Sequence, residues 1–249
     1  MTVRVREVKP SGVWFDVLLV VAFAALTYAL WHGHLVHVDV AVRNWCDAHQ
    51  PRALYWLARA GNLLGQGGTF SALALLLSLF LVWRRHSIRP LLPVLLGFAL
   101  TVGVLTVLKD WTDRPAPHAS HETPPIVHPE RFGAGGVSYP SGHLGNAFVW
   151  YGLLALLLTL WVPLRWRRVI RIVPPVVLTI TTVYLGFHWL SDTVAGILVG
   201  SFLWRIIGRV PWDDIPLGHF VTSRGWADPA IERLDPQAAT ENGRHRKLA

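Results

Sequence analysis

Six long apolar blocks constrain the fold of this chain more than any other feature. They run at about residues 14–34, 67–83, 91–108, 143–163, 169–187 and 190–207. Each block approaches the roughly 20 apolar residues that a helix needs to cross the ~30 Å hydrocarbon core of a bilayer. Because a helix satisfies its own backbone hydrogen bonds in lipid, we expect an all-α fold, a polytopic membrane helix bundle with six transmembrane helices.

The composition supports a bilayer as the solvent of this chain. Hydrophobic residues make up 52% of the 249 residues and charged residues only 15%, and the mean hydropathy is +0.39. The formal net charge of +8 would suit nucleic acid, but no stretch interleaves aromatic and basic side chains as nucleic-acid sites do. The 13 tryptophans fit the headgroup region, which indoles favour. We therefore expect the membrane, and no nucleic acid, among the partners.

Lysines and arginines indicate how the blocks are oriented. Basic residues gather before the first block, in two of the loops and after the last block, at 1–9, 83–90, 164–171 and 205–209. With six spans these segments share one side of the membrane, and the positive-inside rule makes that side cytoplasmic. The opposite, periplasmic or extracellular side then receives residues 35–66, 109–142 and the turn near His188.

This topology divides the chain into three parts, a cytoplasmic N-terminal tail at 1–13, a six-span membrane domain at 14–208 and a polar C-terminal tail at 209–249. The first block is longer than the apolar region of a signal peptide, and five more follow it, so we interpret it as a membrane anchor. Residues 35–66 mix apolar and polar side chains at helical spacing, which predicts one or two interfacial helices. Pro174 and Pro175 predict a kink if they lie deep within their helix.

The loop between the third and fourth blocks carries an unusual density of functional side chains. Loops of this length without regular structure are uncommon in compact proteins and are usually functional. It begins with Lys109 and Arg114 and ends in a Pro-Ser-Gly-His turn. Ser141 is placed to cap the next helix, whose N-terminal amides and dipole attract an anion. Gly142 lets an oxyanion approach the backbone, and His143 can give a proton to a leaving oxygen.

A second group of reactive side chains lies at the start of the last block. His188 and Asp192 are four residues apart and so share one face of a helix. A carboxylate that accepts a hydrogen bond from one imidazole nitrogen fixes the tautomer and makes the other nitrogen more nucleophilic. Both groups fall on the same, non-cytoplasmic side in the predicted topology. We therefore predict that they form one site.

Three histidines of the long loop are candidates for a metal site, namely His118, His121 and His128. Their spacing matches no standard zinc site, and histidines are ordinary residues of surface loops. We therefore expect no metal in this chain.

In order and spacing, the residues of the two groups resemble the type 2 phosphatidic acid phosphatase (PAP2) superfamily. The three motifs of that family are KxxxxxxRP, PSGH and SRxxxxxHxxxD, and the resemblance covers roughly residues 60–208. The family includes membrane lipid phosphatases with six spans. The resemblance implies phosphatase chemistry that needs neither a metal nor another cofactor.

The resemblance also implies a role for each motif residue. His188 would be the nucleophile that forms a phosphohistidine, Asp192 would orient its imidazole, and His143 would be the general acid. The phosphate oxygens would be held by four residues, Lys109, Arg114, Ser141 and Gly142.

Two arginines of the family motifs are absent from this chain. Ala116 stands at the arginine position of the first motif, and Arg114 lies two residues before it. In the third motif Thr181 replaces serine and Thr182 replaces arginine. A charge-assisted hydrogen bond contributes about 1.5–3 kcal/mol, so losing two could slow turnover by orders of magnitude. Arg114, Arg131, Thr182 or a loop histidine could compensate.

Three functions remain open at the level of the sequence. The favoured one is an integral membrane phosphatase that hydrolyses a lipid phosphate or diphosphate, such as a polyprenyl diphosphate, phosphatidate or phosphatidylglycerol phosphate. A phosphotransferase would pass the phosphoryl group to a lipid or sugar acceptor instead of water. A degenerate member would bind a lipid phosphate without catalysis. The two absent arginines favour the last function, whereas the retention of His143, His188 and Asp192 argues against it.

Overall fold

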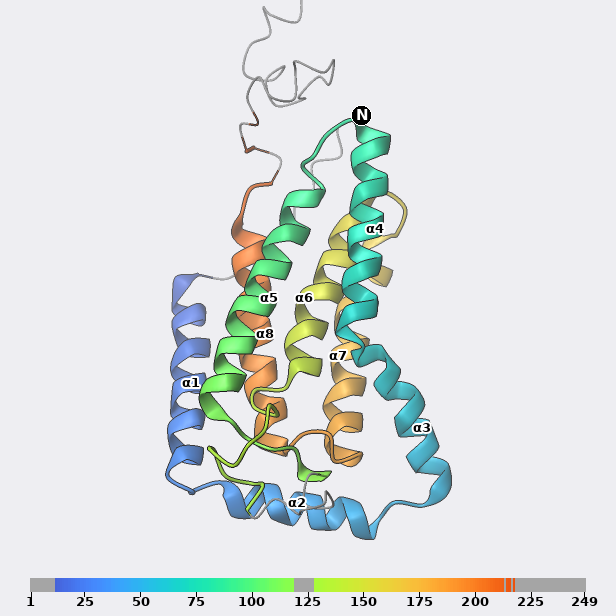
Figure 1. Cartoon of the computed structure of the whole chain (residues 1–249). Coiled ribbons are helices and arrows are strands. Elements are labelled where there is room, and N and C mark those ends of the chain that lie inside the picture. Colours follow the sequence, from blue (N-terminus) through green and yellow to red (C-terminus); the bar gives the residue numbers. More distant parts are fainter. Residues whose placement is uncertain (1–11, 119–127, 213, 216, 218–249) are drawn as a thin grey trace, which may run out of the picture.

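The chain folds into a helical bundle (Figure 1), and the computed structural model describes residues 12–118, 128–212, 214, 215 and 217. Within these ranges the chain forms helices and no strands, as the sequence predicts. The helices are α1 (Val13–Trp31), α2 (Val36–Ala48), α3 (Arg52–Asn62), η1 (Leu63–Gly65), α4 (Gly67–Arg85), α5 (Leu91–Thr112), α6 (Gly142–Leu157), η3 (Leu158–Leu160), α7 (Leu164–Tyr184) and α8 (Leu190–Arg209). Nearly all of the predicted N-terminal tail and most of the predicted C-terminal tail lie outside the described residues.

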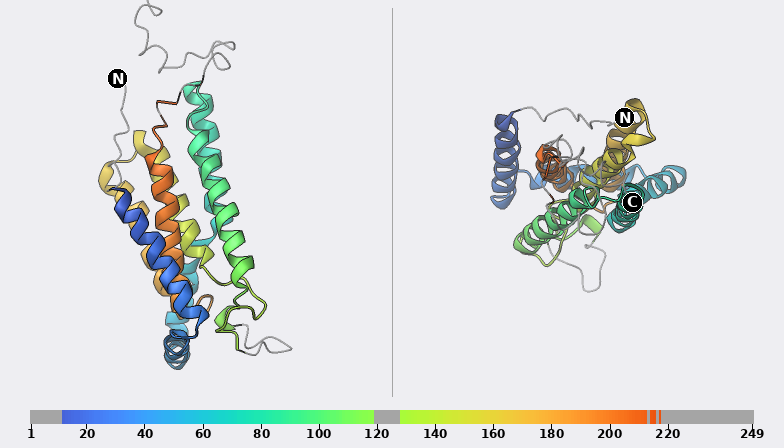
Figure 2. Two further views of the ribbon diagram at one scale, coloured as in Figure 1. Left: turned by 90° about the vertical axis from the view of Figure 1, so that its left-hand side faces the viewer. Right: turned by 90° about the horizontal axis from the view of Figure 1, so that it is seen from above.

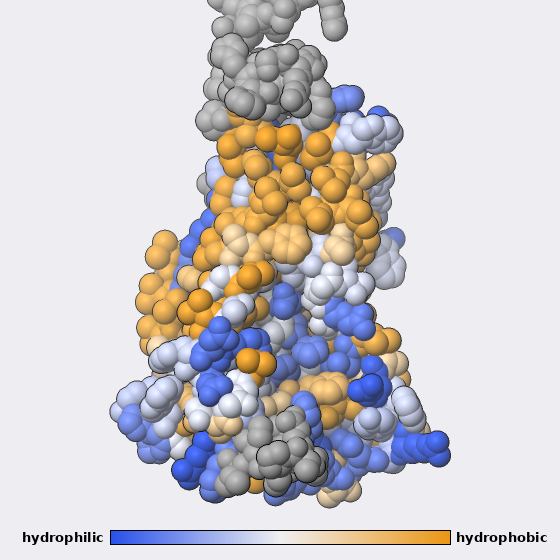
Figure 3. Space-filling model, in the orientation of Figure 1, coloured by the Kyte–Doolittle hydropathy of each residue, from blue (hydrophilic) through white to orange (hydrophobic). Residues whose placement is uncertain are grey.

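Five helices are long and apolar enough to cross a bilayer, namely α1, α4, α5, α6 with its η3 extension, and α8. Large apolar side chains on their outer faces are exposed, among them Val21, Leu76 and Val102. Hydrophobic residues accordingly cover the upper part of the surface, and hydrophilic residues gather around the lower end (Figure 3). A bilayer would cover the apolar band, because soluble proteins rarely expose an apolar patch of that size to water.

The helix α7 corresponds to the remaining predicted span. Its first half carries four arginines, at positions 165, 167, 168 and 171, and its second half is apolar. The six-span count therefore stays a prediction. Pro174 and Pro175 lie in the interior of α7, where both are buried, and the helix continues through them without a break.

The two ends of the bundle differ in character. The starts of α1, α5 and α7 and the ends of α4 and α8 share the upper end in Figure 1. The basic segments 83–90, 164–171 and 205–209 therefore lie at the same end of the bundle, as the topology predicts. At the lower end α2 lies across the bundle and α3 rises from it to α4, also seen from the side in Figure 2. These two helices confirm that residues 35–66 form helices, and their interfacial position stays a prediction.

The helix α6 runs through the middle of the bundle, in contact with α4, α5, α7 and α8. Its side chains Leu144, Val149 and Leu153 are fully buried in the main hydrophobic core. Two glycines bring α8 very close to α6. A Cβ added at Gly200 would lie 3.0 Å from the Cα of Gly145. Since the Pro-Ser-Gly-His turn starts α6 and Asp192 starts α8, this packing fixes the two predicted groups relative to each other.

The closest approach between α8 and the turn is at Gly196. A Cβ there would lie 2.7 Å from the Ser141 carbonyl oxygen and 2.9 Å from the Ser141 Cβ. Gly208, on the same helix, has no neighbour within 4 Å of an added Cβ.

We expect Gly196→Ala to destabilise the protein and Gly208→Ala to leave it as stable or more so. Both substitutions gain about the same helix propensity, roughly 0.5–1 kcal/mol, but only the first forces backbone atoms apart, which typically costs about 1–3 kcal/mol. Thermal unfolding of the purified variants in detergent measures the difference. Equal melting temperatures for the two variants would contradict the close packing.

Candidate active site

The Pro-Ser-Gly-His turn is built into the start of α6 by hydrogen bonds at both ends. The Ser141 hydroxyl accepts from the Leu144 amide at 3.5 Å, which confirms Ser141 as the N-cap. The Ser141 amide donates to the Asp192 carbonyl at 2.9 Å. The turn therefore rests directly on the first turn of α8, and His143 leaves it in the first turn of α6.

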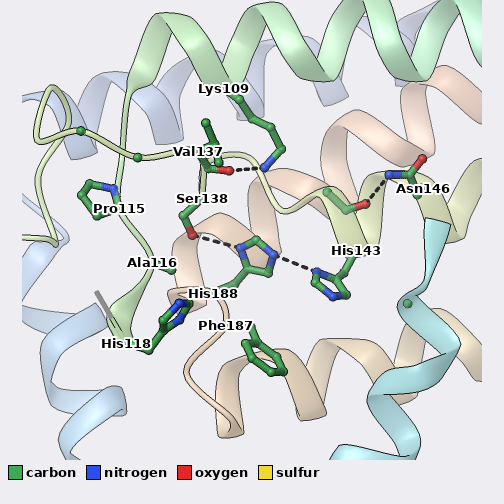
Figure 4. A pocket seen from close by; sticks show the side chains of 14 residues that line it. Lys109, Pro115, Ala116, His118, Val137, Ser138, His143, Asn146, Phe187 and His188 are labelled. Carbon is green, nitrogen blue, oxygen red and sulfur yellow. Dashed lines mark hydrogen bonds between the residues drawn. The ribbon is translucent and has the colours of Figure 1, made fainter. Parts of the chain in front are cut away.

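The imidazoles of His143 and His188 face each other (Figure 4), and His143 Nδ1 lies 3.1 Å from His188 Nε2. The ring planes are inclined at 75°. His188 stands on the short connection between α7 and α8, where Gly186 adopts a φ of 72° that other residues rarely tolerate. The structure therefore brings together the two histidines that the sequence assigns to one site.

Ser138 lies between His188 and Asp192, in place of the direct hydrogen bond that the sequence predicts. His188 Nδ1 is 3.7 Å from the nearer Asp192 oxygen, which is too long for a hydrogen bond. The Ser138 hydroxyl instead lies 3.0 Å from His188 Nδ1 and donates to Asp192 at 2.6 Å. Ser138, which belongs to none of the three motifs, thus links His188 to Asp192 by hydrogen bonds.

Burial determines the protonation of His188. The side chain is 6% exposed, and this burial lowers the pKa of its imidazole below the ordinary value, against the opposing influence of Asp192. At neutral pH the ring is therefore uncharged. When Nδ1 carries the proton and donates it to Ser138, Nε2 presents a lone pair on the side of His143.

Arg114 is fully buried and holds Asp192 on the side away from His188. Its Nη1 donates to Asp192 at 2.5 Å and to the Ser191 hydroxyl at 2.8 Å, and its Nη2 donates to Asp39 at 2.7 Å. Asp39 in turn accepts from the Ser191 amide at 2.9 Å. The result is a buried network of two carboxylates and one guanidinium that joins α2, the loop after α5 and α8.

A cavity of about 520 Å³ opens beside the two histidines. It is lined by Gly65, Lys109, Pro115, Ala116, His118, Gly135, Gly136, Val137, Ser138, Gly142, His143, Asn146, Phe187 and His188. None of these lining residues is acidic. Lys109 extends into the cavity and donates to the Val137 carbonyl oxygen (Figure 4). The N-terminus of α6 at Gly142 adds first-turn amides, so the lining favours an anion.

Several residues predicted to bind phosphate do not line this cavity. Arg114 faces Asp39 and Asp192, and Ser141 is fully buried in the turn. Thr182 is also buried, and its hydroxyl donates to the Leu178 carbonyl at 2.6 Å. Arg131 is exposed outside the lining. Of the predicted phosphate ligands, the structure brings Lys109 and Gly142 to the cavity.

The loop histidines separate in the structure. His118 lines the cavity, with Nδ1 at 3.2 Å from the Gly186 carbonyl oxygen. His128 pairs with Glu130 at the surface, and His121 lies outside the described residues. Among the described residues no cluster of His, Cys, Asp and Glu could hold a metal ion.

Sequence reasoning missed three polar residues of the site. Ser138 stands two residues before the Pro-Ser-Gly-His turn, and only that proximity could have suggested it. Asp39 lies among valines of the 35–66 segment, where an isolated carboxylate signals a buried partner. Asn146 follows His143 by three residues and so lies on the same face of α6, lining the cavity.

The fold and the site define a membrane-embedded protein that presents a histidine pair to a cavity lined by Lys109 and the N-terminus of α6. The profile of the PAP2 superfamily matches residues 90–216, which include every motif residue discussed above. The chain belongs to the PAP2 superfamily.

Individual relatives agree with this assignment. The chain is 31% identical over 106 residues to phosphatidylglycerophosphatase B of Bacillus subtilis, covering 41% of this chain and 48% of that protein. It is 39% identical over 66 residues to undecaprenyl-diphosphatase of Sulfolobus acidocaldarius, covering 26% of this chain and 30% of that protein. These matches thus span about half, or less, of the curated relatives.

The fold is similar to a solved structure, a transmembrane PAP2 type phosphatidylglycerolphosphate phosphatase from Bacillus subtilis. The TM-score is 0.63 at 24% identity, and the match covers 77% of this chain and 93% of that one. Together with the apolar helices, this likeness identifies a multi-pass membrane protein.

We expect Asp39→Asn to destabilise the protein far more than Asp47→Asn on the same helix. The first removes a buried partner of Arg114, a change that typically costs about 3 kcal/mol or more. The second removes the exposed partner of Arg43, a pair worth about 0.3–0.5 kcal/mol. Thermal unfolding in detergent compares them, and similar losses would show that Arg114 does not depend on Asp39.

Proposed function

We propose that this protein is an integral membrane phosphatase that hydrolyses a lipid phosphate or diphosphate through a phosphohistidine on His188. The observation that carries the proposal is the pairing of His188 Nε2 with His143 at 3.1 Å beside a cavity without acidic lining residues. The names of the relatives, a phosphatidylglycerophosphatase and an undecaprenyl-diphosphatase, support a lipid-linked phosphate as substrate.

The proposed reaction has two in-line steps. In the first, His188 Nε2 attacks phosphorus, and the bond from phosphorus to the lipid-side oxygen breaks as His143 gives that oxygen a proton. In the second, His143 takes a proton from water, the resulting hydroxide attacks phosphorus, and the bond to Nε2 breaks to release phosphate. The substrate phosphate would lie between the two rings and replace their 3.1 Å contact.

The phosphate oxygens would be held by Lys109 and by the first-turn amides at Gly142. Lys109 already points into the cavity, where it donates to a carbonyl oxygen that a phosphate would outcompete. Arg114 has a different role from the one that the sequence suggests. Since both of its terminal nitrogens bond carboxylates, we assign it the positioning of Asp192 and, through Ser138, of His188.

The site would face the periplasm or the cell exterior. The residues that line the cavity lie toward the end of the bundle opposite the basic segments 83–90, 164–171 and 205–209, and basic segments favour the cytoplasmic side. A lipid in the outer leaflet could then bring its phosphate to His188 while its chains remain in the bilayer.

We expect purified protein to release phosphate from polyprenyl diphosphate, phosphatidate or phosphatidylglycerol phosphate, and His188→Ala to reduce the rate at least ~10³-fold, as loss of a nucleophile does. His128→Ala, which changes a surface histidine, is the matched control and should stay near the wild-type rate. Equally slow release by wild type and His188→Ala would favour non-catalytic binding. A phosphorylated acceptor in place of free phosphate would identify a phosphotransferase.

Ser138→Ala tests how His188 is oriented. We expect kcat to fall about 10- to 100-fold with little change in KM, because one hydrogen bond to a charged group is worth about 1.5–3 kcal/mol. Ser78→Ala is a suitable control, since that buried serine bonds only to its own helix α4, at the Leu75 carbonyl. Wild-type kcat in Ser138→Ala would show that Asp192 acts on His188 without the serine.

A further inference from the structure

The cavity holds fewer permanent cations than a phosphate group would require. Lys109 is the permanent cation among its described lining residues. At the arginine position of the first motif, Ala116 lines the cavity with a methyl group. At the arginine position of the third motif, Thr182 is fully buried and bonds to its own helix. A phosphate with two negative charges therefore needs a cation from outside the motifs.

The ring of Phe187 marks where such a cation can reach the cavity. Phe187 lines the cavity directly before His188. Its ring stacks parallel to His143, with an interplanar angle of 5° and a centroid distance of 6.2 Å. The guanidinium carbon of Arg59, on α3, lies 5.7 Å from the centroid of the same ring. Arg59 does not itself line the cavity, but its guanidinium contacts the ring of a residue that does.

The backbone of α3 is held firmly at this place. A Cβ added at Gly61 would lie 3.1 Å from Val177 and 3.2 Å from Thr181, so α3 packs tightly on α7 two residues beyond Arg59. Thr181 is the neighbour of Thr182, where the family motif has its arginine. The Tyr151 hydroxyl also donates to the Leu64 carbonyl at 2.9 Å, which ties η1 to α6. The helix α3 thus packs on the end of α7 that lacks the motif arginine, and Arg59 of α3 contacts Phe187 just beyond that end.

We propose that Arg59 binds the substrate phosphate in place of the absent motif arginine at position 182. The inference deepens the proposed function and rests on it. Arg59 is exposed, and among the described residues it makes no ion pair; its contact is with the face of Phe187. A cation–π contact at an exposed position is weak, so an anion in the cavity can draw the guanidinium away from the ring. The planar guanidinium suits bidentate contact with phosphate oxygens.

Steady-state kinetics test the role of Arg59. Arg59→Gln should lower kcat/KM about 10- to 100-fold, as loss of one charge-assisted contact does. Arg52→Gln is the matched control, because Arg52 is an exposed arginine two turns earlier on the same helix, whereas Arg59 contacts the cavity-lining Phe187. It should stay within about twofold of wild type. Arg59→Lys should recover part of the loss, because the charge returns without the planar fork.

Phosphate binding without turnover provides a second readout. Orthovanadate and inorganic phosphate should raise the melting temperature of wild type and Arg52→Gln, and much less that of Arg59→Gln, while all three unfold at the same temperature without anion. If wild type binds these anions in an Arg59-dependent way but releases no phosphate from lipids, the proposed function fails and the Arg59 site stands. If Arg59→Gln keeps wild-type kinetics and anion stabilisation, the inference about Arg59 is overturned.

Discussion

The buried guanidinium of Arg114 is the interaction on which the rest of the site depends. It lies between Asp39 and Asp192, and both carboxylates are almost or fully inaccessible to water. Moving such charges out of water costs several kcal/mol for each ion unless the geometry satisfies them. Here the carboxylates also accept bonds from Ser191 and Trp189, so little hydrogen-bonding capacity is left over. Each charged group of the network therefore depends on the others for its partners. The network joins three segments that are far apart in the sequence.

Glycine packing complements this charge network. Gly196 and Gly200 carry no side chain where α8 approaches α6, and Ser141 of the Pro-Ser-Gly-His turn lies where a Gly196 side chain would be. Ion pairs alone would tolerate shifts of a few tenths of an ångström, since charge interactions fall off slowly with distance. Close backbone contact does not tolerate them. The relative position of His143 and His188 is thus set by steric fit, and the orientation of His188 by the network behind it.

The sequence predicts well those features that depend on residues close together in the chain. Apolar blocks predicted the helices, and Ser141 at the start of the fourth block predicted the cap. The prediction that His188 and Asp192 share a helix face was wrong, because α8 begins at Leu190 and His188 precedes it. Sequence reasoning also failed where the partner comes from a distant segment. Asp39 and Arg59 lie on helices before the motifs, and no periodicity relates them to the site. The sequence predicts Arg114 as a phosphate ligand, whereas the structure turns it to Asp39 and Asp192, because a motif shows the charge of a side chain but not the direction in which it points.

The serine between His188 and Asp192 has a consequence for the stability of a phosphorylated imidazole. Asp192 already accepts from Arg114, Trp189 and Ser138, so it has little tendency to take a proton from His188. A neutral hydroxyl, rather than a carboxylate, is the immediate neighbour of Nδ1. In the proposed cycle the ring would therefore keep its proton and its positive charge after phosphorylation. When the P–N bond of such a cationic ring breaks, the ring leaves as neutral imidazole, a good leaving group, so the same arrangement that orients the nucleophile would make the covalent intermediate short-lived.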